Sequence, residues 1–158
     1  MRSAEKLQSL ETLLRRLERE RAAGRSVALA NGLFDILHVG HLRYLEAAST
    51  EADLLVVGVN SDRSARQLKG PSRPIIPEHE RAELVAGFAC VDFVTIFDGA
   101  TVEELLRSCR PDVHCKGTDY TAESVPEAAI AAELGIRVAI VGDFKQHSSR
   151  DIIDRLKG

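Results

Sequence analysis

The chain has 158 residues, of which 44% are hydrophobic and 28% charged, and its formal net charge is −3. This composition is typical of one globular domain rather than a disordered or fibrous chain, and no apolar run approaches the roughly 20 residues of a membrane span. The small negative charge argues against nucleic-acid binding through a basic surface, and three cysteines without a Cys-x-x-Cys pair favour reduced thiols in a cytoplasmic protein.

Residues 3–23 carry leucines at helical spacing with charges between them, which predicts an amphipathic helix. These leucines are Leu7, Leu10, Leu13, Leu14 and Leu17. We assign residues 1–24 to this helix and residues 25–158 to the main domain. The helix is expected either to pack on that domain or to lie at a homodimer interface.

From residue 27 onward, short apolar runs alternate with helical patterns. The runs at residues 27–30, 53–59, 91–97, 112–115 and 137–141 predict strands. Helical patterns cover residues 39–49, 78–90, 101–108, 126–134 and 148–157. The basic segment at residues 63–73 is broken by prolines and is predicted to be irregular. Strands that alternate with helices predict an α/β fold, a Rossmann-like three-layer α/β/α domain with a five-stranded parallel sheet.

The stretch at residues 31–41 reads Asn-Gly-Leu-Phe-Asp-Ile-Leu-His-Val-Gly-His and joins the first of these strands to a helix. His38 and His41 are three residues apart in the first helical turn, so they project from nearly the same face. Gly40 has no Cβ, so another group can approach the backbone closely. Imidazoles beside the free N–H groups of a helix N-terminus form a site suited to phosphate.

Polar residues also follow the later strands. They lie at residues 60–69 after the second strand, 116–120 after the fourth, and 148–149 after the fifth. Between residues 63 and 73 there are four cations and no acid, a patch suited to a small polyanion. Because ligands bind at the carboxyl ends of parallel strands, the sequence predicts one site at this edge of the sheet.

Together these motifs resemble the H-x-G-H nucleotidyltransferases, the cytidylyltransferase-like superfamily, over residues 27–156. Within it the sequence is most similar to the adenylyltransferases that make ADP-heptose from heptose 1-phosphate. The residues that carry this narrower likeness are 59–62, 68–70, 72–74, Arg81, 91–92, 116–120 and 147–149. Thr118 and Arg150 depart from the family pattern, which usually has a glycine and a hydroxyl residue there. No sugar kinase segment is present, so the stand-alone form is expected.

The resemblance implies transfer of AMP from ATP to a sugar 1-phosphate, D-glycero-D-manno-heptose 1-phosphate, giving ADP-heptose and pyrophosphate. Mg²⁺ would accompany ATP without a dedicated metal site on the protein. Two alternatives stay open. One is a CTP-dependent cytidylyltransferase acting on glycerol 3-phosphate or a similar alcohol phosphate, and the other is a non-catalytic nucleotide-binding regulatory module.

The resemblance also implies roles for individual residues. The predicted catalytic residues are His38, His41 and Lys69. The predicted nucleotide contacts are Asn31, Gly32, Leu33, Phe34, Gly40, His41, Lys116, Gly117, His147, Ser148 and Ser149. The predicted acceptor contacts are Asp35, Asn60, Lys69, Arg73, Asp119 and Tyr120. Arg81 and Asp92 are expected to form an ion pair or to support the nucleotide site. His114 and Cys115 point to opposite faces of a strand, so no metal site is expected there.

Overall fold

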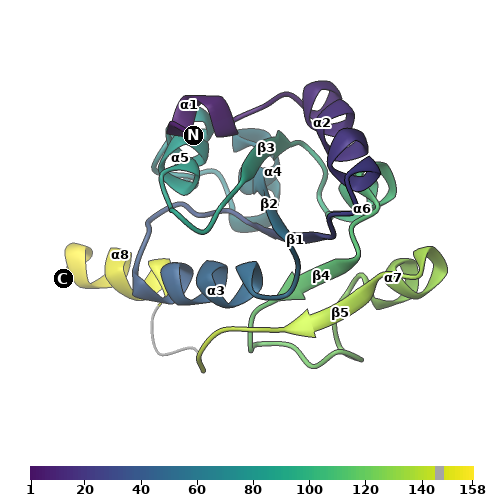
Figure 1. Ribbon diagram of the computed structural model, residues 1–158. Helices are drawn as coiled ribbons and strands as arrows, with labels where there is room; N and C mark the ends of the chain where they lie inside the picture. The colour runs from purple at the N-terminus through teal and green to yellow at the C-terminus, as the bar shows by residue number, and fades with distance from the viewer. Residues whose placement is uncertain (145–147) are drawn as a thin grey trace.

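The computed structural model describes residues 1–144 and 148–158. Its centre is a five-stranded parallel sheet with the strand order β3-β2-β1-β4-β5 (Figure 1). The strands are β1 (Val27–Gly32), β2 (Leu54–Asn60), β3 (Phe93–Phe97), β4 (Val113–Lys116) and β5 (Arg137–Ile140). The α/β fold with a five-stranded parallel sheet is therefore confirmed.

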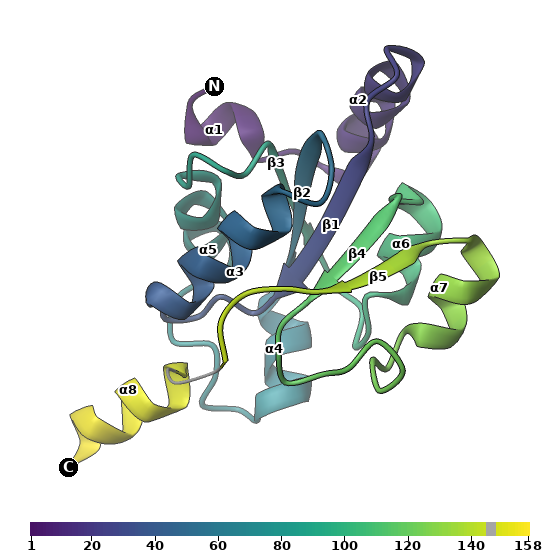
Figure 2. The same cartoon turned by 60° about the horizontal axis from the view of Figure 1, so that its bottom comes forward.

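Helices cover both faces of the sheet (Figures 1 and 2). One face carries α3 (Val39–Ser49) and α5 (Glu78–Ala86), and the other carries α2 (Leu10–Ala22), α6 (Glu103–Cys109) and α7 (Ala128–Leu134). Ala28 and Ala30 of β1 belong to the first core cluster, whereas Val27 and Leu29 belong to the second. Because successive side chains of a strand point to opposite faces, a strand buried on both sides is apolar throughout.

The N-terminal segment differs from the single helix that the leucine spacing predicted. It forms α1 (Ser3–Lys6) and α2, and Leu7 between them makes a parallel bridge to Val94 of the edge strand β3. Ser9 then begins α2 by accepting a hydrogen bond from the backbone N–H of Thr12 at 3.2 Å. The helix breaks because this short stretch pairs with an otherwise open sheet edge.

A further correction concerns the basic segment, where α4 (Asp62–Lys69) replaces the irregular chain expected from the prolines. Ser61 caps this helix by accepting from Ser64 N at 3.1 Å, and Asp62 lies in its first turn. Pro71 and Pro74 come after the helix has ended, so they do not interrupt it.

Other boundaries shift by a few residues. The helix predicted to residue 90 ends at Ala86, and the strand predicted from residue 91 begins at Phe93. The last helix, α8 (Ser149–Lys157), projects from the body of the molecule (Figure 2). The three cysteines are free thiols. Among the described residues, no helix is long and apolar enough to cross a membrane.

The strand order reverses between β1 and β4. The chain builds β1, β2 and β3 outward in one direction and then returns to place β4 on the other side of β1. At such a point the loops after the two strands diverge and leave a crevice at their carboxyl ends. The segments that follow β1, β4 and β5 lie at the edge formed by the carboxyl ends of the strands, where α4 and α8 also lie (Figure 2).

Candidate active site

The end of β1 leads into a tight turn built around an aromatic ring. Phe34 is buried and has a positive φ of 50°. A Cβ on Gly32 would lie 3.1 Å from this ring, so a larger residue would force the ring to shift. Gly32 is a predicted nucleotide contact, and in the structure the Phe34 ring packs against it.

The two histidines close the first turn of α3. His38 Nδ1 accepts a hydrogen bond from Gly40 N at 3.1 Å, and His41 Nδ1 accepts one from His38 N at 3.3 Å. The ring centroids of the two histidines are 4.0 Å apart. A ring nitrogen that accepts a hydrogen bond carries no proton, so each neutral ring has its proton on Nε2. Helix capping thus makes Nε2–H the donor of both residues, and both residues line a cavity.

Asp35 fastens the segment after α4 to the turn after β1. Its buried carboxylate accepts from Arg73 Nε at 2.6 Å, from Ile75 N at 2.9 Å and from Ile76 N at 3.0 Å. Burial by itself raises the pKa of Asp35, but the N–H groups of Ile76 and Ile75 and the Arg73 guanidinium outweigh it and hold the pKa below its usual value. Asp35 therefore stays ionised and fixes Arg73 beside the cavity.

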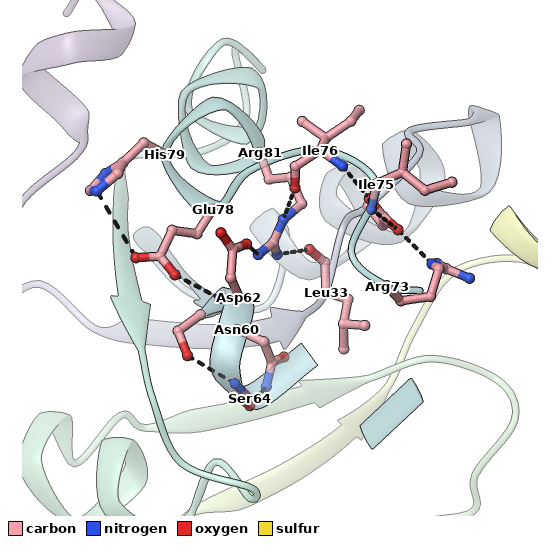
Figure 3. A network of polar contacts seen from close by, with 12 residues as sticks. Leu33, Asn60, Asp62, Ser64, Arg73, Ile75, Ile76, Glu78, His79 and Arg81 are labelled. Carbon is pink, nitrogen blue, oxygen red and sulfur yellow. Dashed lines mark hydrogen bonds and ion pairs between the residues drawn. The ribbon is translucent and has the colours of Figure 1, made fainter. Parts of the chain in front are cut away.

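A buried arginine supports the same turn from behind. The Arg81 side chain is fully buried, and Figure 3 shows its guanidinium between the carbonyl oxygens of Leu33 and Ile76 and the carboxylate of Asp62. The ion pair expected between Arg81 and Asp92 is wrong. Asp92 instead accepts from Leu55 N at 2.8 Å, on the other side of β2 from β1. Arg81 joins α4, α5 and the turn after β1 into one unit.

The loop after β4 presents a lysine beside an aromatic ring. Lys116 Nζ lies 4.8 Å from the centre of the Tyr120 ring and 4.0 Å from the buried carboxylate of Glu127. Thr118, which departs from the family pattern, donates from Oγ1 to the carbonyl of Asp143 at 2.7 Å. This hydrogen bond joins the loop after β4 to the segment after β5.

The start of α8 lines the same cavity as the histidines. Ser148 caps the helix by accepting from Asp151 N at 3.1 Å, and Ser149 donates from Oγ to the carbonyl of Ile36 at 2.9 Å. The N-terminus of α8 is thereby tied to the loop that precedes the histidines. His147, a predicted nucleotide contact, lies outside the described residues.

These elements enclose a cavity of about 1200 Å³. The predicted site residues that line it are Asn31, Gly32, Leu33, Phe34, Asp35, His38, Gly40, His41, Lys69, Arg73, Lys116, Gly117, Asp119, Tyr120, Ser148 and Ser149. Asn60 does not line the cavity: its side chain is buried and donates to Ser64 Oγ at 2.8 Å. Its placement gives no support to the predicted acceptor contact.

Sequence reasoning missed several lining residues. These are Arg43 and Tyr44 on α3, the segment at residues 141–144, and Asp151 on α8. Arg43 forms an exposed ion pair with Asp143 at 2.9 Å. The rule that marked residues 116–120, a position directly after a strand, applies equally to residues 141–144. Among the described residues, no group of three or more His, Cys, Asp or Glu side chains could hold a metal ion.

Residues 29–153 match the family model described as cytidylyltransferase-like. The chain is 46% identical over 151 residues to the bifunctional protein HldE of Syntrophotalea carbinolica, which covers 96% of this chain and 31% of that protein. It is 43% identical over 152 residues to the bifunctional protein HldE of Geotalea uraniireducens, again covering 96% of this chain and 31% of the relative. The chain thus spans about a third of the length of these relatives.

Among solved structures, the lipopolysaccharide core biosynthesis protein from Thermoplasma volcanium GSS1 superposes with a TM-score of 0.67. It is 26% identical in sequence and covers 77% of this chain and 100% of its own. The family indicated by the sequence motifs is therefore confirmed.

Proposed function

The chain belongs to the cytidylyltransferase-like family of nucleotidyltransferase enzymes, and we propose that it transfers AMP from ATP to a sugar 1-phosphate. The proposed acceptor is D-glycero-D-manno-heptose 1-phosphate, and the products are ADP-heptose and pyrophosphate. A phosphate oxygen of the acceptor attacks the α-phosphorus of ATP while the bond to the bridging oxygen of pyrophosphate breaks. Such a reaction depends mainly on positioning and on charge stabilisation.

The observation that carries this proposal is the histidine pair, because His38 and His41 together cap the start of α3 and both line the cavity. Because Nδ1 of both rings accepts from the backbone, Nε2–H is the group with which His38 and His41 can donate, and we assign it to a phosphate oxygen of ATP. Negative charge builds on the oxygen that leaves with pyrophosphate, and hydrogen bonds donated to it by the two imidazoles would stabilise the transition state. The N-terminus of α3 adds its partial positive charge to the same place.

The cations of the cavity divide between its two sides. We assign Lys69 and Arg73 to the acceptor phosphate, because Asp35 holds Arg73 on the wall formed by the segment after α4. Lys116 and the N-terminus of α8, with Ser148 and Ser149, are assigned to ATP. Mg²⁺ would enter with the triphosphate, which needs at most one or two protein carboxylates.

The heptose acceptor is supported by the names of the relatives rather than by the shape of the cavity. The curated relatives are named bifunctional protein HldE, and the solved neighbour is titled a lipopolysaccharide core biosynthesis protein. The residues after β2 and β4 also resemble the pattern of heptose 1-phosphate adenylyltransferases, apart from Thr118. A homodimer and a cytoplasmic location stay predictions.

The proposal is tested by pyrophosphate release from the purified chain with Mg²⁺. ATP and CTP are each combined with heptose 1-phosphate, heptose 7-phosphate and glycerol 3-phosphate. We expect turnover with ATP and heptose 1-phosphate. Turnover with CTP and glycerol 3-phosphate would replace our assignment with the cytidylyltransferase alternative, and nucleotide binding without turnover on any acceptor would favour a regulatory module.

Replacing His41 by alanine tests the role of the histidine pair. Loss of one preorganised donor typically lowers the rate by about 10²–10³-fold, so His41→Ala should lose turnover by that factor. His79→Ala is the matched control, because His79 is an exposed histidine on α5 outside the cavity. Circular dichroism should show both variants folded. Equal turnover in both variants would remove His41 from the mechanism.

A further inference from the structure

We propose that His114 is a positioning residue, which orients the side-chain amide of Asn31 so that Asn31 Nδ2 donates to a phosphate oxygen of the bound nucleotide. The nature of the ligand rests on the proposed function. The pairing of the two side chains is a feature of the fold itself.

Asn31 and His114 lie on β1 and β4, the two neighbouring strands between which the strand order reverses. Leu29 of β1 is in register with His114 of β4, so Asn31, two residues further along, lies on the same face. His114 is fully buried, and its Nε2 lies 3.1 Å from Asn31 Oδ1. Asn31 lines the cavity and His114 does not. The histidine therefore acts on the cavity through the asparagine.

The proton of the imidazole decides which way the amide faces. Burial, together with the nearby Lys116, lowers the pKa of His114 to about 3, so the ring is neutral and has one N–H. His114 Nδ1 is buried and has no hydrogen-bond partner among the described residues. A buried nitrogen without a partner is better left unprotonated, because orphaned N–H donors are rarer in proteins than under-satisfied acceptors. The proton therefore sits on Nε2, which donates to Asn31 Oδ1.

This donation sets the direction of the Asn31 amide. Oδ1 is turned toward His114, so the NH₂ group points away from it, and because Asn31 lines the cavity we infer that this group faces the cavity. The flipped amide would set its own N–H donors against His114 Nε2–H. An apolar side chain at position 114 would avoid the unpartnered Nδ1, so the hydrogen bond to Asn31 is what the imidazole adds. The result is a donor held in place before the nucleotide binds.

The test is a double-mutant cycle of wild type, His114→Leu, Asn31→Ala and the double variant, with pyrophosphate release and ATP titration calorimetry as readouts. We expect His114→Leu to fold with an unchanged or higher melting temperature. Its kcat/KM for ATP should fall about tenfold, the scale of one hydrogen bond, while the KM for the acceptor is unchanged. In the Asn31→Ala background, His114→Leu should have no further effect.

His114→Gln is the conservative variant, since its amide nitrogen can donate from a similar reach, and it should recover most of kcat/KM for ATP. Equal effects of His114→Leu in the wild-type and Asn31→Ala backgrounds would overturn the inference, as would wild-type kinetics in His114→Leu. If the wild type turns over no acceptor, the proposed function fails separately. The same cycle is then read from the ATP dissociation constant, where coupling supports the inference and additivity overturns it.

Discussion

At the scale of the residue, the hydrogen bonds that a polar side chain already makes determine which of its atoms can donate and which can accept. Nδ1 of His38 and of His41 accept from the backbone, which makes Nε2–H the donor in each ring. Asp35, a predicted acceptor contact, lines the cavity and accepts with both carboxylate oxygens from Arg73 and from the backbone of Ile75 and Ile76. Its contribution to the cavity is thus to hold the guanidinium that we assign to the acceptor.

The pH dependence of stability tests the engagement of Asp35. Because the folded-state pKa of Asp35 lies below its unfolded value of about 4, its contribution is complete above that value and is lost as the pH falls through the folded pKa. Asp35→Asn should lower the free energy of unfolding by about 3 kcal/mol at neutral pH, since it leaves Arg73 without its partner. Urea titrations should show the difference from wild type shrinking below about pH 4.

Asp154→Asn, at an exposed position on α8, serves as the control and should leave the unfolding free energy nearly unchanged at every pH. A loss in Asp35→Asn that stays constant down to strongly acidic pH would show that the carboxylate charge is not what stabilises this segment.

At the scale of the element, the starts of α2 and α4 follow capping side chains more closely than hydrophobic periodicity. Ser61 begins α4 within a segment that its prolines had marked as irregular, and Ser9 begins α2 after a break that the leucine stripe did not reveal. Within α2, Leu13 and Leu17 are fully buried, whereas Leu10 is 37% exposed. The buried leucines of this helix face its own sheet, together with Phe93 and Leu106.

Truncating a leucine of α2 measures that packing. Leu17→Ala should lower the unfolding free energy by about 2–5 kcal/mol, because it leaves a cavity in the core. Leu10→Ala, the partly exposed control on the same helix, should cost much less. The melting temperature of Leu17→Ala should not depend on protein concentration, whereas a concentration dependence would indicate that α2 stabilises a dimer. Light scattering of the wild type reports the oligomeric state directly.

At the scale of the whole molecule, the fold collects positive charge at one place on a chain whose net charge is −3. The basic side chains that line the cavity come from four segments of the chain and are Arg43, Lys69, Arg73, Lys116 and Arg150. The acidic side chains that line it are Asp35, Asp119, Asp143 and Asp151. Asp143 pairs with Arg43 and Asp35 pairs with Arg73, and the remaining basic side chains favour a polyanionic substrate. The topological switch between β1 and β4 is what brings these segments to a common edge.

This focusing predicts a salt-sensitive affinity for ATP. Screening shortens from a length of about 10 Å at 0.1 M salt to about 3 Å at 1 M, so the KM for ATP should rise several-fold over that range. Arg150→Gln should reduce the salt dependence because it removes a cavity cation. Arg15→Gln, an exposed position on α2 outside the cavity, should leave it unchanged. A KM for ATP that is independent of salt would contradict the prediction.

The sequence by itself determined the strands, their parallel arrangement and the edge at which the site forms. Strands buried on both faces must be apolar throughout, and parallel strands bring the segments that follow them to one edge. The motif at residues 31–41 and the residues after β4 could therefore be placed in a common site before any contact was known. Local patterns of this kind depend only on residues close together in the chain.

Only the tertiary structure decided which side chains pair. Arg81 pairs with Asp62 rather than Asp92, Asp35 holds Arg73, and His114 reaches Asn31 from 83 positions away in the chain. Arg43 and Asp143 join the cavity although neither carries a motif. Partners of this kind depend on register and on the order of strands in the sheet. A pattern with a period of two or 3.6 residues specifies a face, but not the residue that lies opposite.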